Sequence, residues 1–279
     1  MAAPALSPSR AKDFQQCPLL FRYRTVDRLP EPASPAAAKG TLVHAVLERL
    51  YDVAPPQRTP AYACGLLPGQ WEELQRRDPR VKQLFDTAEE LHTWLDEART
   101  LVERYFTIET PANLAPAGRE RRVEVRIAHG VLLRGIVDRV DVASDGAMRI
   151  VDYKTGKSPR ARFVGEALFQ MRFYALMIWR LTNQIPARLQ LVYIADGQVL
   201  TLDPTRAQLE ATEAEIQQLW ERIEQTAKSG EFPPRKTPLC GWCNFQTFCP
   251  IFNGDVLPLP PGGIDRLLRT RQTPDATAS

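Results

Sequence analysis

The sequence predicts an α/β fold in which a mixed central sheet is flanked by helices. Two runs rich in Val, Ile and Leu, 131–142 and 148–153, flank Asp145-Gly146, and this arrangement is a strong signal for a β-hairpin. Along the chain, the expected order is helices, three strands, a helix, two strands and a helix. This order is typical of an α/β domain with a mixed sheet.

Bulk composition places the chain among globular proteins. Its 279 residues are 44% hydrophobic and 25% charged, and they can bury a full core. No apolar run approaches membrane-spanning length, and the N-terminal residues contain no signal-peptide core. We therefore expect a cytoplasmic protein without a membrane partner. The net charge of +3 is too small to indicate a nucleic-acid partner by itself.

The N-terminal segment is predicted to be helical and basic. Ser7-Pro8 supplies an N-cap and a first helical residue for a short helix that runs toward Cys17. The aromatic and basic segment LLFRYRTVDRL follows. Its Arg22 and Arg24 either contact phosphates or are solvated beside buried aromatic neighbours, and the sequence leaves both interpretations open.

A helical insertion is expected at about 55–110, after the helix KGTLVHAVLERLYD. His44 on that preceding helix is either a packed or surface residue or a functional one. The stretch 55–68 is expected to be an irregular connection that contains Cys64 as a free, partly buried thiol. The stretch 87–106 has the apolar stripe of a core helix.

The hairpin at 131–157 contains the most reactive set of side chains. Side chains alternate along a strand, so Asp152 and Lys154 project from the same side, and antiparallel pairing brings Asp138 near Asp152. Two converging carboxylates repel each other unless a cation joins them, which favours a divalent metal. Ordinary surface ion pairs are the alternative. Glu124, on the preceding strand, either faces this site or is solvated.

The rest of the chain is predicted to complete one domain over 1–253. The helix at 161–181 places Gln170 and Tyr174 on one face, where Gln170 is either functional or merely exposed and Tyr174 either functional or packed. Two strands and a long amphipathic helix follow. From about 254 to 279 the chain is rich in Pro, Gly and Thr, which predicts a disordered tail.

Three cysteines in CGWCNFQTFCP have the spacing C-x2-C-x5-C, which is typical of metal ligands; they are Cys240, Cys243 and Cys249. Three thiolates need a fourth ligand, and Cys17 is a better candidate than Cys64 because it also lies beside a proline. Such a site, formed by 237–250 and Cys17, would join the two ends of the chain. Zinc and a [4Fe-4S] cluster are both compatible with four thiolates.

Taken in order, these segments resemble the RecB-type exonucleases of the PD-(D/E)XK nuclease superfamily, including the iron-sulfur branch that contains Cas4 and the AddB nuclease domain. The resemblance rests on CPLLFRYR, GTLVHAVLE, GIVDRVD, IVDYKTGK, the QMRFY helix and the three C-terminal cysteines. It implies a restriction-endonuclease-like core with a helical insertion. No proline precedes the acid of GIVDRVD, which is a departure from the general superfamily motif.

The resemblance implies roles for named residues. It implies a site for Mg²⁺ or Mn²⁺ with ligands from three segments, namely His44, Asp138, Asp152 and the backbone carbonyl of Tyr153. Lys154 would be the motif lysine, and Gln170 and Tyr174 would lie near the DNA backbone. A [4Fe-4S] cluster, favoured over zinc, would be held by Cys17, Cys240, Cys243 and Cys249.

The activity implied by the resemblance is metal-dependent hydrolysis of DNA from single-stranded ends in repair or recombination, with a helicase or recombination protein as a partner. Two alternatives share the same residues: a Cas4-like nuclease in CRISPR spacer acquisition, and a non-catalytic DNA-binding subunit of a helicase-nuclease complex. A zinc-ribbon binding protein, in which the acid-lysine hairpin is a coincidence, is the remaining alternative.

Overall fold

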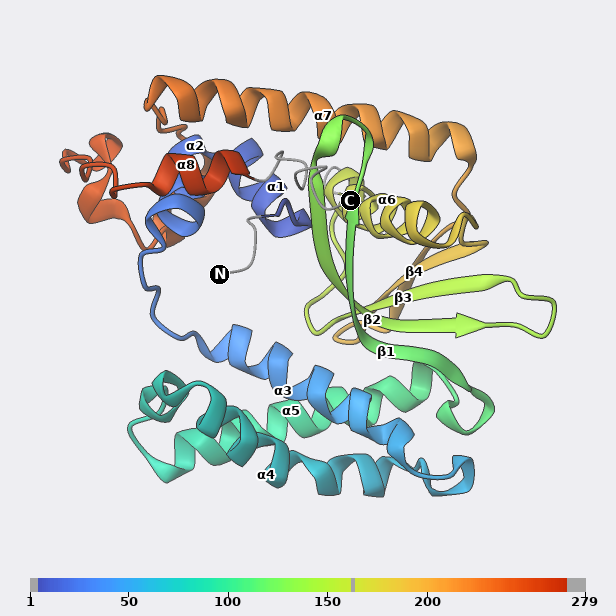
Figure 1. Ribbon diagram of the computed structural model, residues 1–279. Coiled ribbons are helices and arrows are strands. Elements are labelled where there is room, and N and C mark those ends of the chain that lie inside the picture. The colour runs from blue at the N-terminus through green and yellow to red at the C-terminus, as the bar shows by residue number, and fades with distance from the viewer. Residues whose placement is uncertain (1–4, 162–163, 270–279) are drawn as a thin grey trace, which may run out of the picture.

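The structure, a computed structural model, describes residues 5–161 and 164–269, and its centre is a five-stranded mixed sheet (Figure 1). The strands are β1 (Pro116–Arg126), β2 (Leu132–Val142), β3 (Met148–Lys154), β4 (Arg188–Tyr193) and β5 (Gln198–Leu202). They lie side by side in chain order. β3 and β4 are parallel, and the other neighbouring pairs are antiparallel. The predicted α/β class with a mixed sheet is therefore confirmed.

The β2-β3 hairpin turns at the predicted Asp145-Gly146. Gly146 has a φ of +84°, a left-handed conformation that costs glycine less than any other residue. The Asp145 side chain accepts a hydrogen bond from the amide of Ala147 at 2.9 Å, which stabilises the turn. Local chemistry at the turn thus fixes the hairpin register.

Helices cover both faces of the sheet, as Figure 1 shows. One face packs against α6 (Val164–Thr182), α7 (Arg206–Ser229) and the N-terminal α1 (Pro8–Gln16) and α2 (Pro18–Phe21). The other face packs against α3 (Pro35–Arg49), α4 (Pro60–Arg77) and α5 (Ala88–Ile108). Each face has its own hydrophobic core, and β3 supplies side chains to both, with Ile150 in the first core and Val151 in the second.

The expected irregular connection at 55–68 is wrong, because α4 begins at Pro60. Thr59 caps this helix by accepting a hydrogen bond from the amide of Tyr62 at 3.2 Å, and Pro60 occupies the first turn, where a proline costs nothing. Pro68 lies inside the helix and removes one backbone hydrogen bond. Burial of the neighbouring apolar face, which includes Cys64, offsets that loss.

The C-terminal stretch also differs from the predicted disordered tail. A short helix, α8 (Gly263–Leu268), contacts α7, and its Leu267 is buried. The Leu257 carbonyl accepts a hydrogen bond from Arg22. The structure therefore packs 254–269 onto the N-terminal core, because a few apolar residues are spaced among the prolines. Residues 270–279 lie outside the described part of the chain.

Candidate active site

The candidate site is built where β2 and β3 separate. Their backbone pairing runs from Val142 and Met148 to Arg139 and Val151, and it ends there. One residue further on, Oδ2 of Asp138 accepts a hydrogen bond from the amide of Tyr153 at 2.7 Å. The carboxylate thus takes the place of a backbone acceptor, which holds the Asp138 side chain between the two diverging strands.

Asp152 lies on the α6 side of β3 and is only 5% exposed. Its Oδ2 forms an ion pair with Nζ of Lys154 at 2.7 Å, as strand alternation predicts, and its Oδ1 accepts a hydrogen bond from Nε2 of Gln170 at 3.1 Å. Burial, followed by the negative charge of Asp138, raises the pKa of Asp152 to about 6. The carboxylates of Asp138 and Asp152 therefore favour a cation close by. The single positive charge of Lys154 neutralises only part of their negative charge.

His44 reaches this site from α3. Its Nε2 donates a hydrogen bond to the backbone carbonyl of Tyr153 at 2.9 Å, and its Nδ1 lies 3.4 Å from Oδ2 of Asp138. Burial alone would disfavour the charged imidazole. The interactions with Asp138 and Glu120 outweigh that effect and raise the pKa of His44 to about 10. A cation is therefore favoured at this position, as either a proton or a metal ion.

Glu120 is a site residue that the sequence reasoning missed. It lies in β1 opposite Asp138, its φ is +42°, and its Oε1 is 3.8 Å from Nδ1 of His44. Ligand atoms of His44, Glu120 and Asp138 all lie within 4.8 Å of one another. If residues of β1 and β2 are paired outward from the turn that joins them, Glu120 falls opposite Asp138. The sequence could therefore have identified Glu120 in this way.

A buried arginine, Arg139, contacts residues that adjoin the site. Arg139 is 1% exposed, and it bonds both carboxylate oxygens of Glu109 at 2.7 Å each. Its Nη1 also donates to the hydroxyls of Tyr51, Tyr105 and Tyr153. The side chain of Tyr153 is thereby fixed in the α3–α5 core while its carbonyl points to His44. Arg139 thus helps to position the backbone of the site.

The predicted pairing of Gln170 and Tyr174 on one face of α6 agrees with the structure. The amide of Gln170 lies 3.5 Å from the Tyr174 hydroxyl, at the limit of a hydrogen bond. Burial raises the pKa of Tyr174, so its phenol stays protonated. A Cβ at Gly135 of β2 would lie 2.6 Å from Cε1 of Tyr174, so only glycine lets this ring reach its position.

Arg22 and Arg24 do not join this site. Arg22 is 3% exposed and forms an ion pair with Asp27, so its guanidinium is buried against its own segment. Arg24 binds Asp13 at 2.7 Å and Glu31 at 2.8 Å. Both arginines fasten the N-terminal segment instead. The sequence predicts that Glu124 either faces the site or is solvated. It forms an exposed ion pair with Arg134 and does not pair with Asp138 or Asp152.

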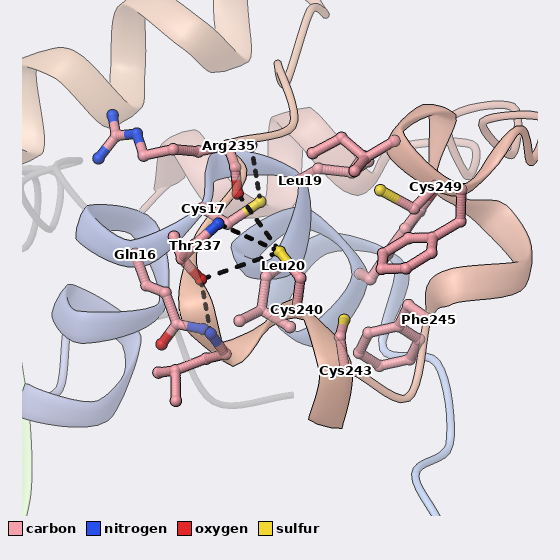
Figure 2. A pocket seen from close by; sticks show the side chains of 14 residues that line it. Gln16, Cys17, Leu19, Leu20, Arg235, Thr237, Cys240, Cys243, Phe245 and Cys249 are labelled. Carbon is pink, nitrogen blue, oxygen red and sulfur yellow. Dashed lines mark hydrogen bonds between the residues drawn. The ribbon is translucent and has the colours of Figure 1, made fainter.

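A second feature is a hollow between the N-terminal segment and the loop after α7 (Figure 2). Four cysteines line it, namely Cys17, Cys240, Cys243 and Cys249. The amide of Arg235 donates to Sγ of Cys17 at 3.4 Å, and that of Thr237 donates to Sγ of Cys240 at 3.3 Å. Cys64 belongs instead to the α3–α5 core. The four thiols that the sequence pattern groups therefore line one hollow.

None of the helices within residues 5–161 and 164–269 has the length and apolar character needed to cross a membrane.

Comparison with known proteins places this geometry in context. A model of the PD-(D/E)XK nuclease superfamily matches residues 5–250. The gene 69 protein of Mycobacterium phage L5 is 31% identical over 127 residues, which cover 44% of this chain and 41% of that protein. The gene 69 protein of Mycobacterium phage D29 is 23% identical over 288 residues, which cover 89% of this chain and 97% of that protein.

Among solved structures, a protein from Eubacterium rectale described as a candidate exonuclease superposes with a TM-score of 0.58 and covers 92% of this chain and 91% of its own. Its sequence identity is 14%, so this likeness shows the fold alone. The match to the superfamily model and the likeness in fold agree on the same α/β core.

Proposed function

We propose that this chain, which belongs to the PD-(D/E)XK nuclease superfamily, is a metal-dependent DNA exonuclease. It would act on single-stranded ends in repair or recombination. The observation that carries the proposal is the convergence of His44 and Asp138 on the backbone of Tyr153, with Asp152 and Lys154 on the same strand. These residues come from three segments that are distant in sequence, and a surface ion pair would not require that arrangement.

The donor set suits a hard divalent cation. Carboxylates, a carbonyl and one imidazole are ligands that Mg²⁺ and Mn²⁺ accept. We assign His44, Asp138, Asp152 and the Tyr153 carbonyl as ligands, with Glu120 beside them. Mg²⁺ or Mn²⁺ held there would supply Lewis-acid activation for phosphodiester hydrolysis.

The other residues of the site hold and orient the reacting groups. Lys154 presents its ammonium beside Asp152, where it can position the attacking water or stabilise negative charge that develops on the phosphate. Gln170 holds one oxygen of Asp152, which leaves the carboxylate in a defined orientation. The neutral phenol of Tyr174 offers a hydrogen-bond donor toward a phosphate oxygen.

For the cysteine hollow we propose a [4Fe-4S] cluster that fastens the two ends of the chain together. Four thiolates around one zinc ion would lie about 3.8 Å apart, because each Zn–S bond is about 2.3 Å. Within the described residues, no three of these sulfur atoms lie within 4.8 Å of one another, so the thiols are spaced more widely than one zinc ion requires. The two amide donors to sulfur are also the kind of contact that surrounds cluster thiolates.

The test is to purify the protein without oxygen, to measure its iron content, and to follow end-labelled single-stranded and duplex DNA with Mg²⁺ or Mn²⁺. Wild type should shorten the single strands, and Lys154→Ala should lower the rate by at least about a hundredfold. Lys228→Ala, at the exposed end of α7, is the matched control and should keep the wild-type rate. Equal rates for wild type and Lys154→Ala would refute the assignment of the active site.

A further inference from the structure

One tryptophan differs sharply from the others. Of the five tryptophans, Trp242 is 79% exposed, whereas the remaining four are at most 6% exposed. Leaving a large indole in water forfeits the favourable free energy of its burial. Trp242 lies between Cys240 and Cys243, in the segment that follows α7. None of the roles assigned above uses it.

The backbone around Trp242 is held by contacts of the neighbouring residues. Trp242 ends the short 3₁₀ helix Pro238–Trp242, and Leu239 lies three residues earlier. Side chains three residues apart eclipse in a 3₁₀ helix, so Leu239 and Trp242 share one face. The next residues are anchored, because the Gln246 side chain bonds the Cys240 carbonyl at 2.8 Å and Phe245 packs on Tyr23.

The exposed apolar surface extends beyond the indole. Leu239 and Phe252 are both exposed, and both line the hollow that contains the four cysteines. These two side chains and Trp242 are the large exposed apolar residues of the segment 232–254, and the three are called the patch. The charged side chains of this segment are the cations Arg235 and Lys236, and the carboxylates nearest in sequence, Glu231 and Asp255, lie just outside it. The charge of the segment therefore favours an anionic occupant over a neutral one.

We propose that this patch is a platform for single-stranded DNA, on which a base stacks against Trp242 while neighbouring phosphates lie near Arg235 and Lys236. Stacking needs an unpaired base with an open face, and inside a duplex those faces are already covered. The platform therefore binds single strands in preference to duplexes. This inference rests on the proposed function, since it assigns a second contact for the same substrate.

The test measures binding separately from hydrolysis. Anisotropy of a fluorescein-labelled oligo(dT) is followed with full-length, anaerobically purified protein in EDTA, so that cleavage does not interfere. Trp242→Ala should weaken binding about tenfold, and Trp242→Phe should restore most of it. Leu181→Ala removes another exposed apolar side chain, 47% exposed at the end of α6, and should leave the affinity unchanged. Binding of a blunt duplex should change less than twofold in every variant.

Two further readouts identify the contact itself. Oligo(dT) should quench the emission of the single exposed tryptophan, and this quenching should disappear in Trp242→Phe. Replacing Lys236 with Ala should reduce the slope of log affinity against log salt by about 0.7, the value for one phosphate contact on a single strand.

Unchanged oligo(dT) affinity in Trp242→Ala, or quenching that persists in Trp242→Phe, would overturn the platform. A change from dimer to monomer in Trp242→Ala without loss of DNA affinity would also overturn it, in favour of a contact between copies of the chain. If wild type hydrolyses DNA while these results appear, only the platform fails. If wild type neither binds nor hydrolyses DNA, the proposed function fails.

Discussion

Replacing Glu109 with Gln should destabilise the protein through its buried partner, Arg139. Arg139 is 1% exposed and uses two nitrogens to bond the two oxygens of Glu109. The substitution removes the negative charge and turns an amide NH₂ toward a guanidinium that has only donors. The guanidinium of Arg139 would still have one carboxylate partner, because its Nε lies 3.1 Å from Oδ1 of Asp141.

Removing one partner of a buried ion pair costs about 3–5 kcal/mol. Since Asp141 still compensates part of the charge of Arg139, we expect a loss of about 3 kcal/mol at neutral pH. For a chain of this size, 1 kcal/mol corresponds to about 2–4 °C in Tm, so the midpoint should fall by about 6–12 °C. Thermal unfolding followed by circular dichroism measures this shift.

The effect should also depend on pH with a definite sign. Burial would raise the pKa of Glu109, but the hydrogen bonds and charge of Arg139 outweigh it, and the pKa lies below its ordinary value of 4.5. A depressed pKa in the folded state means that the stabilisation is complete above the unfolded pKa and is lost as the pH falls through the folded pKa. The difference in the free energy of unfolding between wild type and Glu109→Gln should therefore become smaller only below about pH 4.5.

Glu103→Gln on the exposed side of α5 serves as the control and should change the unfolding free energy by less than about 0.5 kcal/mol. A Tm for Glu109→Gln within 2 °C of wild type would refute the role of the pair, using the conversion above. So would a gap that stays constant down to about pH 3, since the charge of Glu109 would then not be its origin.

Three further predictions concern the two sites. Gly135→Ala should push the ring of Tyr174 out of place, costing about 1–3 kcal/mol and lowering DNA hydrolysis more than DNA binding. Glu120→Gln should weaken binding of Mn²⁺, measured by calorimetry, by about tenfold, and EDTA should abolish hydrolysis until Mg²⁺ or Mn²⁺ is restored. Cys243→Ser should lower the iron content and the Tm, because the proposed cluster links the two ends of the chain.

Each of these predictions has a control elsewhere in the chain. A Cβ at Gly69 meets nothing within 4 Å, so Gly69→Ala should not reduce activity. Glu124→Gln lies on the same strand as Glu120 and should leave Mn²⁺ affinity unchanged, and Cys64→Ser should keep the iron content. Full iron in Cys243→Ser, or equal Mn²⁺ affinity in both glutamate variants, would contradict the corresponding assignment.

The sheet and the central hairpin could be predicted because the signals that specify them are local. Apolar runs beside Asp145-Gly146 determine the strands and the turn together, and the turn sets the register. Strand alternation then places Lys154 beside Asp152. The helical spacing of Gln170 and Tyr174 follows from the same kind of periodicity.

Other features depend on long-range packing that local patterns do not encode. Pro68 argues locally against a helix, yet burial of the surrounding α4 face outweighs it. The C-terminal prolines argue for disorder, yet Leu267 finds an apolar site against the N-terminal core. The sequence left two interpretations of Arg22 open because its partners, Asp27 and the Leu257 carbonyl, are identified only by the tertiary fold.

The geometry of the candidate site follows from the way β3 divides its side chains between two cores. Asp152 faces α6 and meets Gln170, whereas the next side chain, Tyr153, enters the α3–α5 core and its carbonyl meets His44. Two adjacent residues therefore tie the site to both helical layers. Because β3 lies between the layers, movement of either one relative to the sheet would separate the groups at the site. Packing in both cores is thus part of what keeps the site assembled.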